Sequence, residues 1–268
     1  MSANSQRVNI IDPSYPSGAV KCTSQEYLQA ISEGDIPGHS IFEKIGYSPA
    51  STAAETTLWT AGSAYVFPVG AISVEAVSAS ASDTSAGTGA RTVQVIYLDI
   101  NYVQKEFIFT MNGVTPVAGP TDFFRVNTFH IETAGSGGKA AGIISLRLVG
   151  GGATVYSQMP AGSTRSRNSA YTVPAGQTVY IQSILLSAAY STAGKAVRMI
   201  LHASKTPDGT ISTAGTIFWP QMEAMLVDNA LTFDRRSPII LPAKTDIKVS
   251  VIGETNAICT STISGWIE

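Results

Sequence analysis

Alternating apolar and polar residues recur along most of this chain, and this pattern constrains the fold more than any other feature. The alternation is clear at residues 72–76 and again at 246–251. A period of two places every second side chain on the same face of a strand, so each segment has one apolar face and one polar face. From about Leu58 onward, strand-like segments come about every ten residues with no long helical pattern between them, as in β-sandwiches. The sequence therefore predicts an all-β fold, an antiparallel β-sandwich or jelly roll.

Two further segments, 93–100 and 107–111, are apolar on both faces. Strands of that kind are covered on two sides, so we expect both to lie inside a sheet. Turn residues support the division into strands. Asn112-Gly113 favours a tight two-residue hairpin, because both positions accept positive φ. Pro174-Ala175-Gly176 and Pro207-Asp208-Gly209 place proline before glycine, as β-turns do.

The beginning of the chain has a different pattern. Thr23 and Ser40 each stand three residues before a glutamate, which is the spacing of a capping box at a helix start. This spacing predicts two short helices, one over residues 27–31 and one over residues 41–45. A glycine follows each of them and is placed to end it. These glycines are Gly34 and Gly46.

The two patterns give a domain organisation. Residues 1–50 are expected to form an N-terminal arm with two short helices, and residues 51–268 a single β domain. The segments 135–142 and 149–168 are rich in glycine and serine and fit hairpin loops about as well as a junction. An alternative boundary within the β region therefore lies near 150–170.

Composition excludes two classes of partner. Only 13% of the residues are charged, against about 25% in a typical domain, and the net charge of −2 leaves no basic stripe for nucleic acid. The longest apolar stretches, such as 93–100 and 179–186, are much shorter than the roughly 20 residues of a membrane-spanning helix. The amino terminus also lacks the basic and apolar segments of a secretory signal. We expect no nucleic acid and no membrane among the partners.

The small-residue segment 78–89, which precedes a strand, is the first candidate for chemistry. Gly87-Thr88-Gly89 resembles part of a phosphate-binding loop, but Thr92 stands where the third glycine is needed, and a strand follows instead of a helix. Asp83 lacks the further acids of a calcium loop. We therefore interpret Asp83 as a turn former in a mobile loop that moulds against a neighbouring molecule.

Catalytic and metal-binding residue patterns are weak. The histidines lack metal-ligand spacing, and His202 is expected at a surface or an interface. There is no GxSxG elbow, and a pair of glycosidase acids could form only through folding. The histidines are His39, His130 and His202, and the acids are Asp99, Asp122, Glu132 and Asp246. The sequence predicts no catalytic residue, no metal ligand and no cofactor, and the protein is not expected to be an enzyme.

Aromatic residues offer one alternative, a platform on which sugar rings could stack, although core or subunit-contact positions fit most of them better. They are Trp59, Trp219, Trp266, Tyr65, Phe67, Phe123 and Phe124. The segment RRSPII from Arg235 reads as a turn with two solvated charges. Cys22 and Cys259 are far apart in sequence, and two free, mostly buried thiols are the expectation.

Several longer segments together resemble a family of β-rich virion structural proteins from tailed bacteriophages, especially marine and cyanobacterial ones. The most specific segment is SASDTSAGTGART, followed by a strand and the later Asn-Gly turn. The matching segments are IPGHSIFEKIGYSP (36–49), TTLWTAGSAYVFP (56–68), VSASASDTSAGTGARTVQVIYLD (77–99), MNGVTPV (111–117), RVNTFHIETAGSGGKAAGII (125–144) and YTVPAGQTVYI (171–181). The likeness extends from about Ile36 to the carboxyl end.

The resemblance implies a structural virion protein with no catalytic residue to carry over. We expect a capsid decoration or cement protein on the phage head, a homo-oligomer and specifically a trimer, whose partner is the major capsid protein or another virion protein. A low-charge β domain with an arm suits assembly by extended contacts. The alternatives are a tail or fibre-base component, a carbohydrate-binding host-recognition module, and a hydrolase built on the same fold.

Overall fold

The computed structural model describes residues 27–190, 195–205 and 217–268. These residues form antiparallel β-sheets, and the helix among them is a single short one, α1 (Tyr27–Ser32). The expected all-β class and the antiparallel pairing are therefore confirmed. The expected segment around Pro207, together with the arm before Tyr27, lies outside the described residues.

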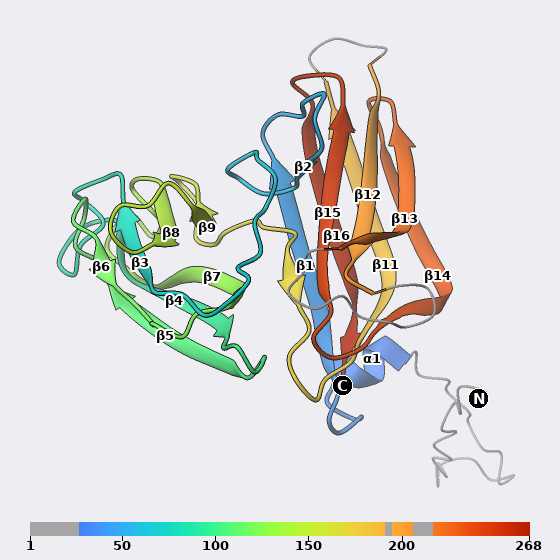
Figure 1. The fold of residues 1–268 in the computed structure, drawn as a ribbon, viewed down its shortest axis with the longest axis horizontal. Helices are drawn as coiled ribbons and strands as arrows, with labels where there is room; N and C mark the ends of the chain where they lie inside the picture. Colours follow the sequence, from blue (N-terminus) through green and yellow to red (C-terminus); the bar gives the residue numbers. More distant parts are fainter. Residues whose placement is uncertain (1–26, 191–194, 206–216) are drawn as a thin grey trace, which may run out of the picture.

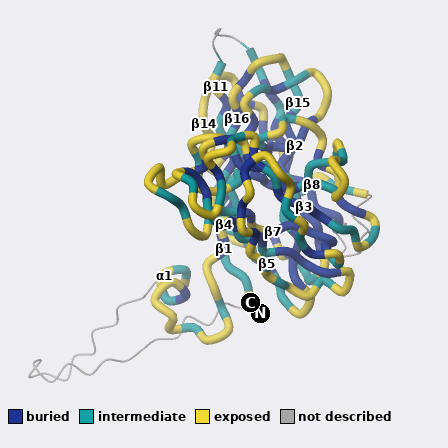
Figure 2. The backbone as a smooth tube through the Cα atoms, turned by 90° about the vertical axis from the view of Figure 1, so that its left-hand side faces the viewer, coloured by how far each residue is buried: buried dark blue, intermediate teal, exposed yellow. Residues whose placement is uncertain are grey.

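Two separate hydrophobic clusters divide the described β residues into two units. The first cluster contains Phe42, Leu58 and buried residues from Val173 to Ile263, whereas the second contains buried residues from Trp59 to Ala170. We call residues 40–58 together with the described part of 171–268 the first unit, and residues 59–170 the second unit. Figure 1 shows the second unit, coloured cyan to yellow-green, lying beside the taller first unit. In Figure 2 the buried backbone concentrates inside these units, and exposed backbone concentrates in the loops.

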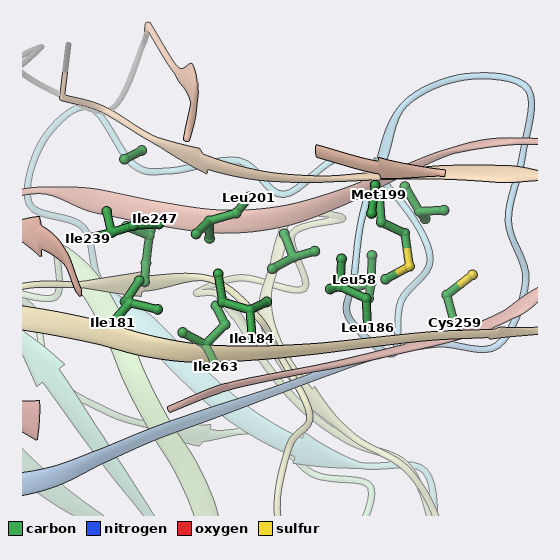
Figure 3. Close-up of a cluster of buried hydrophobic side chains, with 14 of the residues drawn as sticks. Leu58, Ile181, Ile184, Leu186, Met199, Leu201, Ile239, Ile247, Cys259 and Ile263 are labelled. Carbon is green, nitrogen blue, oxygen red and sulfur yellow. The ribbon is translucent and has the colours of Figure 1, made fainter. Parts of the chain in front are cut away.

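The first unit consists of two sheets that share one core. The first sheet has the order β1 (Ser40–Ser48), β16 (Ile258–Ile267), β11 (Val179–Ala189) and β14 (Ala230–Leu241). The second has the order β10 (Tyr171–Thr172), β15 (Asp246–Gly253), β12 (Val197–Ala203) and β13 (Trp219–Leu226), with β2 (Thr56–Thr57) also paired to β15. Figure 3 shows Ile184 and Leu186 of β11 in the layer between the strands, with Leu201 of β12 opposite.

One strand of the first unit is interrupted by the whole second unit. Strands β2 and β10 both pair with β15, with Thr57 opposite Ser250 and Tyr171 opposite Ile247. Between them the amide of Leu58 donates to the carbonyl of Val249 at 2.8 Å. With β2 and β10 counted as halves of one strand, the described strands of the first unit, numbered along the chain, have the sheet orders 1-8-3-6 and 2-7-4-5.

The chain leaves and re-enters the first unit at adjacent backbone positions. The amide of Ser169 donates to the carbonyl of Leu58 at 2.9 Å. The Ser169 hydroxyl also donates to the Val249 carbonyl and accepts from the Val249 amide, each at 3.1 Å. The Ser169 side chain thus makes two hydrogen bonds to the backbone of β15 at the point where the paired strand is interrupted.

The second unit also has two sheets. One has the order β6 (Val117–Ala118), β3 (Val74–Ser78), β8 (Ile144–Leu148) and β9 (Val155–Met159), and the other has the order β5 (Gln104–Thr110), β4 (Ala90–Leu98) and β7 (Arg125–Ala134). Strand β4 is central, as the apolar segment 93–100 predicts. Strand β5 lies at an edge, so the expectation of a central strand at 107–111 is wrong. Phe109 reaches the core, while Ile108 on the opposite face is half exposed.

Buried polar contacts join the two units. Arg125 of β7 lies against Asp246 of β15, and both side chains are excluded from solvent. Two residues further along β7, the Asn127 side chain donates to the carbonyl of Thr172, the β10 residue opposite Asp246, at 2.9 Å and accepts from the Thr172 amide at 3.0 Å. Because these contacts are directional, they fix the second unit against the first in one orientation.

The second expected helix is wrong, because residues 40–48 form strand β1. This strand pairs with β16 over nine positions, from Ser40 opposite Ile267 to Ser48 opposite Cys259. Pairing over that length outweighs a local capping signal, and the β-branched Ile41 and Ile45 suit a strand. The first helix is confirmed as α1, and Gly34 follows it at φ 81°.

The turn predictions have mixed outcomes. Gly176 has φ 77°, and the Gln177 amide donates to the Pro174 carbonyl, so this turn is confirmed. Gly113 has φ 61°, so a turn exists there too, but the expected hairpin is wrong. The next strand, β6, pairs with β3 instead of β5, because the chain crosses at this turn from one sheet to the other.

Candidate functional site

Asp83 is a buried anchor that holds two loops together. Its side chain accepts hydrogen bonds from the amides of Ala90 and Ala141 through Oδ1, and from the Ser78 hydroxyl and the Gly142 amide through Oδ2, at 2.5 to 3.0 Å. The residue is fully buried. The interpretation of Asp83 as a turn former in a mobile loop is therefore wrong, since four donors from three segments occupy its carboxylate.

Close packing leaves no room for a side chain at three glycines in and beside this loop. A Cβ on Gly89 would lie 2.1 Å from Oδ1 of Asp83, and one on Gly87 would lie 2.1 Å from the Ser82 carbonyl oxygen. Gly135, in the opposing loop, would place a Cβ 2.1 Å from the Gly87 carbonyl oxygen. The segment that resembled a phosphate loop is thus part of a tightly packed pair of loops. The Gly87 and Gly89 amides donate to the carbonyls of Thr84 and Ser82, and the Ala90 amide donates to Asp83.

The candidate histidines lie in three unrelated places. His39 Nε2 is 2.8 Å from a carboxylate oxygen of Glu268, and His130 Nε2 is 3.6 Å from Glu132. His202 is largely buried, which rules out the surface position that was one of the two expectations for it, and desolvation lowers its pKa. Among the described residues, no group of three or more histidine, cysteine or acidic side chains is placed to hold a metal ion.

Folding brings two of the candidate acids together. Lys105 Nζ lies 3.1 Å from Asp99 and 2.6 Å from Asp122, and the Tyr97 hydroxyl donates to Asp122 at 2.9 Å. Because Lys105 donates to Asp99 and Asp122, both acids keep a pKa below the usual value despite the opposing effect of burial on Asp99. Lysine-paired carboxylates of lowered pKa are poor proton donors, so this cluster lacks the raised pKa of a general acid.

Most of the candidate aromatic residues belong to the core. Trp59, Tyr65, Phe67, Phe123 and Phe124 are each at most 8% exposed. Trp266 is partly buried and stacks on Tyr180, with ring centroids 4.8 Å apart. These five buried side chains cannot offer a face to a sugar ring.

The first unit has an open edge, which we define by Met225, Val227, Leu231, Arg235 and Arg236. Strands β13 and β14 are the last strands of their two sheets, are consecutive in the chain and contact each other. Met225 is 63% exposed, and Val227 and Leu231 are also exposed. Long edge strands with exposed apolar side chains are positions where other chains add. The sequence analysis singled out Arg235 and Arg236, as charges of an expected turn, but not Met225, Val227 or Leu231.

Strand β14 carries a bulge at the open edge. Ile239 is opposite Ile181 and Asp234 is opposite Ser183. Between these pairs β14 has four residues, 235–238, whereas β11 has one, Gln182. The bulge contains Arg235 and Arg236, both exposed, and the expected turn of RRSPII is therefore a bulge within a strand. It borders a depression of about 580 Å³. Its lining residues are Met222, Thr232, Phe233, Asp234, Arg235, Arg236 and Ser237.

On the opposite side of the first unit the edges are covered. The Tyr47 amide of β1 donates to the Arg167 carbonyl at 3.3 Å, and the Arg167 guanidinium lies 4.3 Å from the centre of the Tyr47 ring. The interrupted strand β2/β10 is flanked by the second unit, as Figure 1 shows. The other two end strands of the described sheets of the first unit are β13 and β14.

The described part of the chain contains one cysteine, Cys259, which is free and buried, while Cys22 lies outside it. Burial raises the pKa of the Cys259 thiol to about 12. Across residues 27–190, 195–205 and 217–268, no helix has the length and apolar character needed to cross a membrane.

Comparison with known proteins yields no family. No family model matches the chain, and no curated protein matches it. A solved structure of the infectious bursal disease virus Gt strain aligns with 91% of this chain and 77% of its own at 11% identity and a TM-score of 0.16. The VP2 subviral particle of infectious bursal disease virus aligns with 88% of this chain and 77% of its own at 11% identity and a TM-score of 0.17. Scores this low carry no inference about fold or function.

Proposed function

We propose that this chain is a structural virion protein whose first unit is a jelly roll, and that it decorates the head of a tailed bacteriophage. The strand order carries this proposal. Sheets ordered 1-8-3-6 and 2-7-4-5 have the connectivity of two Greek keys rolled into two facing sheets. Jelly rolls of this kind build many virus shells, and they also occur in lectins and cupins.

Two further observations support a structural role over the other jelly-roll functions. The aromatic side chains that a lectin would need for stacking are mostly inside the core of the second unit. The polar loop around Asp83 is saturated by internal hydrogen bonds. The sequence resemblance to virion proteins of tailed bacteriophages, given by segments such as 77–99 and 125–144, points in the same direction.

In this proposal the open edge is the contact with neighbouring virion proteins, either further copies in a trimer or the major capsid protein. Exposed Met225, Val227 and Leu231 supply apolar area, and the edge backbones of β13 and β14 supply hydrogen-bonding groups. The bulge with Arg235 and Arg236 interrupts regular strand addition, so pairing is directed to one part of the edge.

Cryo-electron microscopy of particles that contain this chain tests the proposal. Density for the chain on the outer surface of the head supports it, and density in the tail, at a fibre base or nowhere in the particle contradicts the decoration role. Native mass spectrometry of the purified protein tests the oligomer. We expect a trimer for the wild type and a monomer for the double variant M225K/L231K.

A matched control separates this effect from a general loss of solubility or folding. Val69 is 77% exposed, lies in the second unit and is not among the residues that define the open edge. V69K should remain a trimer. If M225K/L231K remains a trimer as well, the open edge is not the subunit contact.

A further inference from the structure

A cleft lies where β1 of the first unit meets β7 of the second. Its volume is about 410 Å³, and its walls come from three segments: β1, β7 and the chain returning toward the first unit. The lining residues are Glu43, Lys44, Ile45, Asn127, Thr128, Phe129, His130, Ile131, Thr164, Arg165 and Ser166. The cleft therefore exists only because the two units are joined.

Positive charge predominates among the groups of the cleft. Lys44, Arg165 and His130 are basic side chains, and Glu43 is the one acid among the lining residues. Within the described residues, neither Lys44 nor Arg165 has a carboxylate within 4.0 Å, whereas Lys105, Arg125 and Arg147 do.

Lys44 is held in position by the second unit. Its Nζ donates to the Asn127 carbonyl at 2.5 Å, and it also lies 5.8 Å from the centre of the Tyr171 ring. Asn127 is in turn bound to Thr172 by two hydrogen bonds. The side chain is thus fixed in the cleft, and the printed hydrogen bond to Asn127 uses one of the three donors of the ammonium form within the part of the chain that the structure describes.

The surroundings of Lys44 are unfavourable for its charge. Desolvation and the positive charge of Arg165 lower the pKa of Lys44 to about 7. A bound anion would supply the missing negative charge and reverse this effect. Three hydroxyl-bearing residues, Thr128, Thr164 and Ser166, are also among the lining residues of the cleft.

We propose that this cleft binds a tetrahedral oxyanion, a phosphate or sulfate group, between Lys44 and Arg165. Arginine binds two oxygens of such a group at once, and lysine acts as a point charge. The group can be a free ion or an ester on a larger molecule, and the chemistry of recognition is the same. This inference depends on the cleft alone, so it does not fall with the proposed virion role.

Isothermal titration calorimetry of the full chain with inorganic phosphate, inorganic sulfate and glycerol 3-phosphate, at constant ionic strength in chloride, tests the proposal. We expect saturable binding of at least one oxyanion to the wild type. R165Q and K44M should each weaken that binding at least tenfold. Tighter binding of glycerol 3-phosphate than of inorganic phosphate would identify an ester as the better ligand.

The control is R235Q/R236Q, which removes two exposed arginines from the open edge and should bind like the wild type. Arg165 is exposed, so R165Q keeps the experiment informative if K44M fails to fold. Absence of saturable binding, or equal weakening in R235Q/R236Q and R165Q, overturns the proposal.

Discussion

Arg125 and Asp246 form a two-point ion pair across the junction of the two units. Nε of Arg125 donates to Oδ1 of Asp246 at 2.9 Å, and Nη2 donates to Oδ2 at 3.0 Å. The side chains are 0% and 1% exposed. The guanidinium also lies 3.8 Å from the centre of the Phe124 ring, and Nη1 donates to the Pro68 and Phe124 carbonyls. Each nitrogen of the Arg125 head group therefore donates at least one hydrogen bond.

Removing one partner of this pair should be costly. R125M leaves Asp246 as a buried carboxylate without its counter-ion, and we expect the free energy of unfolding to fall by about 3–5 kcal/mol. Urea unfolding measures this loss. R198Q is the control, since Arg198 pairs with Glu223 at the surface at 3.7 Å and should lose less than about 1 kcal/mol. A loss in R125M no larger than that of R198Q would contradict the prediction.

Asp83 gives a second prediction about stability. D83A leaves three amides and one hydroxyl without their acceptor, and unsatisfied buried groups cost about 1–3 kcal/mol each, so we expect a loss of at least about 3 kcal/mol. Chemical denaturation of D83A checks the value. S85A changes an exposed residue two positions away in the same loop and should unfold like the wild type. Equal stability of the two variants would show that the carboxylate is dispensable.

Lys44 should make stability depend on pH. Its pKa is lowered from 10.5 to about 7 in the folded chain by desolvation and by Arg165, with Glu43 and His130 as the other titratable groups of the cleft. Between these two values the unfolded chain binds a proton that the folded chain lacks, so stability rises with pH across this range and the Lys44 contribution levels off below about pH 7. Urea unfolding from pH 6.5 to 9.5 measures the slope. K44M should reduce it, and an unchanged slope in K44M would be inconsistent with this assignment.

Cys259 should be unreactive in the native protein. Burial raises its pKa to about 12, so very little thiolate exists at neutral pH, and the thiolate is the reacting form. An aromatic disulfide reagent at pH 8 should label Cys259 only after denaturation, as mass spectrometry of the labelled peptides will show. C22S removes the second thiol and leaves Cys259 as the sole site. Rapid labelling of native C22S would contradict the burial of Cys259.

Sequence periodicity correctly predicted where strands lie and which of their faces is apolar, because both depend on residues that are close together in the sequence. The alternation at 246–251 is that of a strand, and Ile247, Val249 and Val251 are all fully buried. The opposite face was expected to be polar and exposed, yet Asp246 and Ser250 are buried as well. Asp246 is covered by Arg125 of the second unit, and Ser250 lies between Ile200 of β12 and Thr57 of β2. Periodicity carries no information about which distant segment will cover a face.

The same limit explains the errors at Asp83 and at residues 41–45. Asp83 meets the amides of Ala141 and Gly142, nearly 60 positions away, and β1 pairs with a strand at the other end of the chain. Local signals such as an Asx turn or a capping box were present, but long-range partners decided the structure. The close approach at Gly89 could have been anticipated only if its partner had been known.

The hydrogen bond between Leu58 and Ser169 places the two ends of the second unit side by side. The first unit can therefore keep its sheet whatever segment connects these two residues. A chain that lacked residues 59–168 could join these two positions with little movement of either, and β2 and β10 would then continue as one strand along β15. Conversely, a chain of very different length could leave at the same point without disturbing the sheet. The interrupted strand is therefore an insertion site for whole domains. The first unit can keep its fold while the inserted domain is replaced by another.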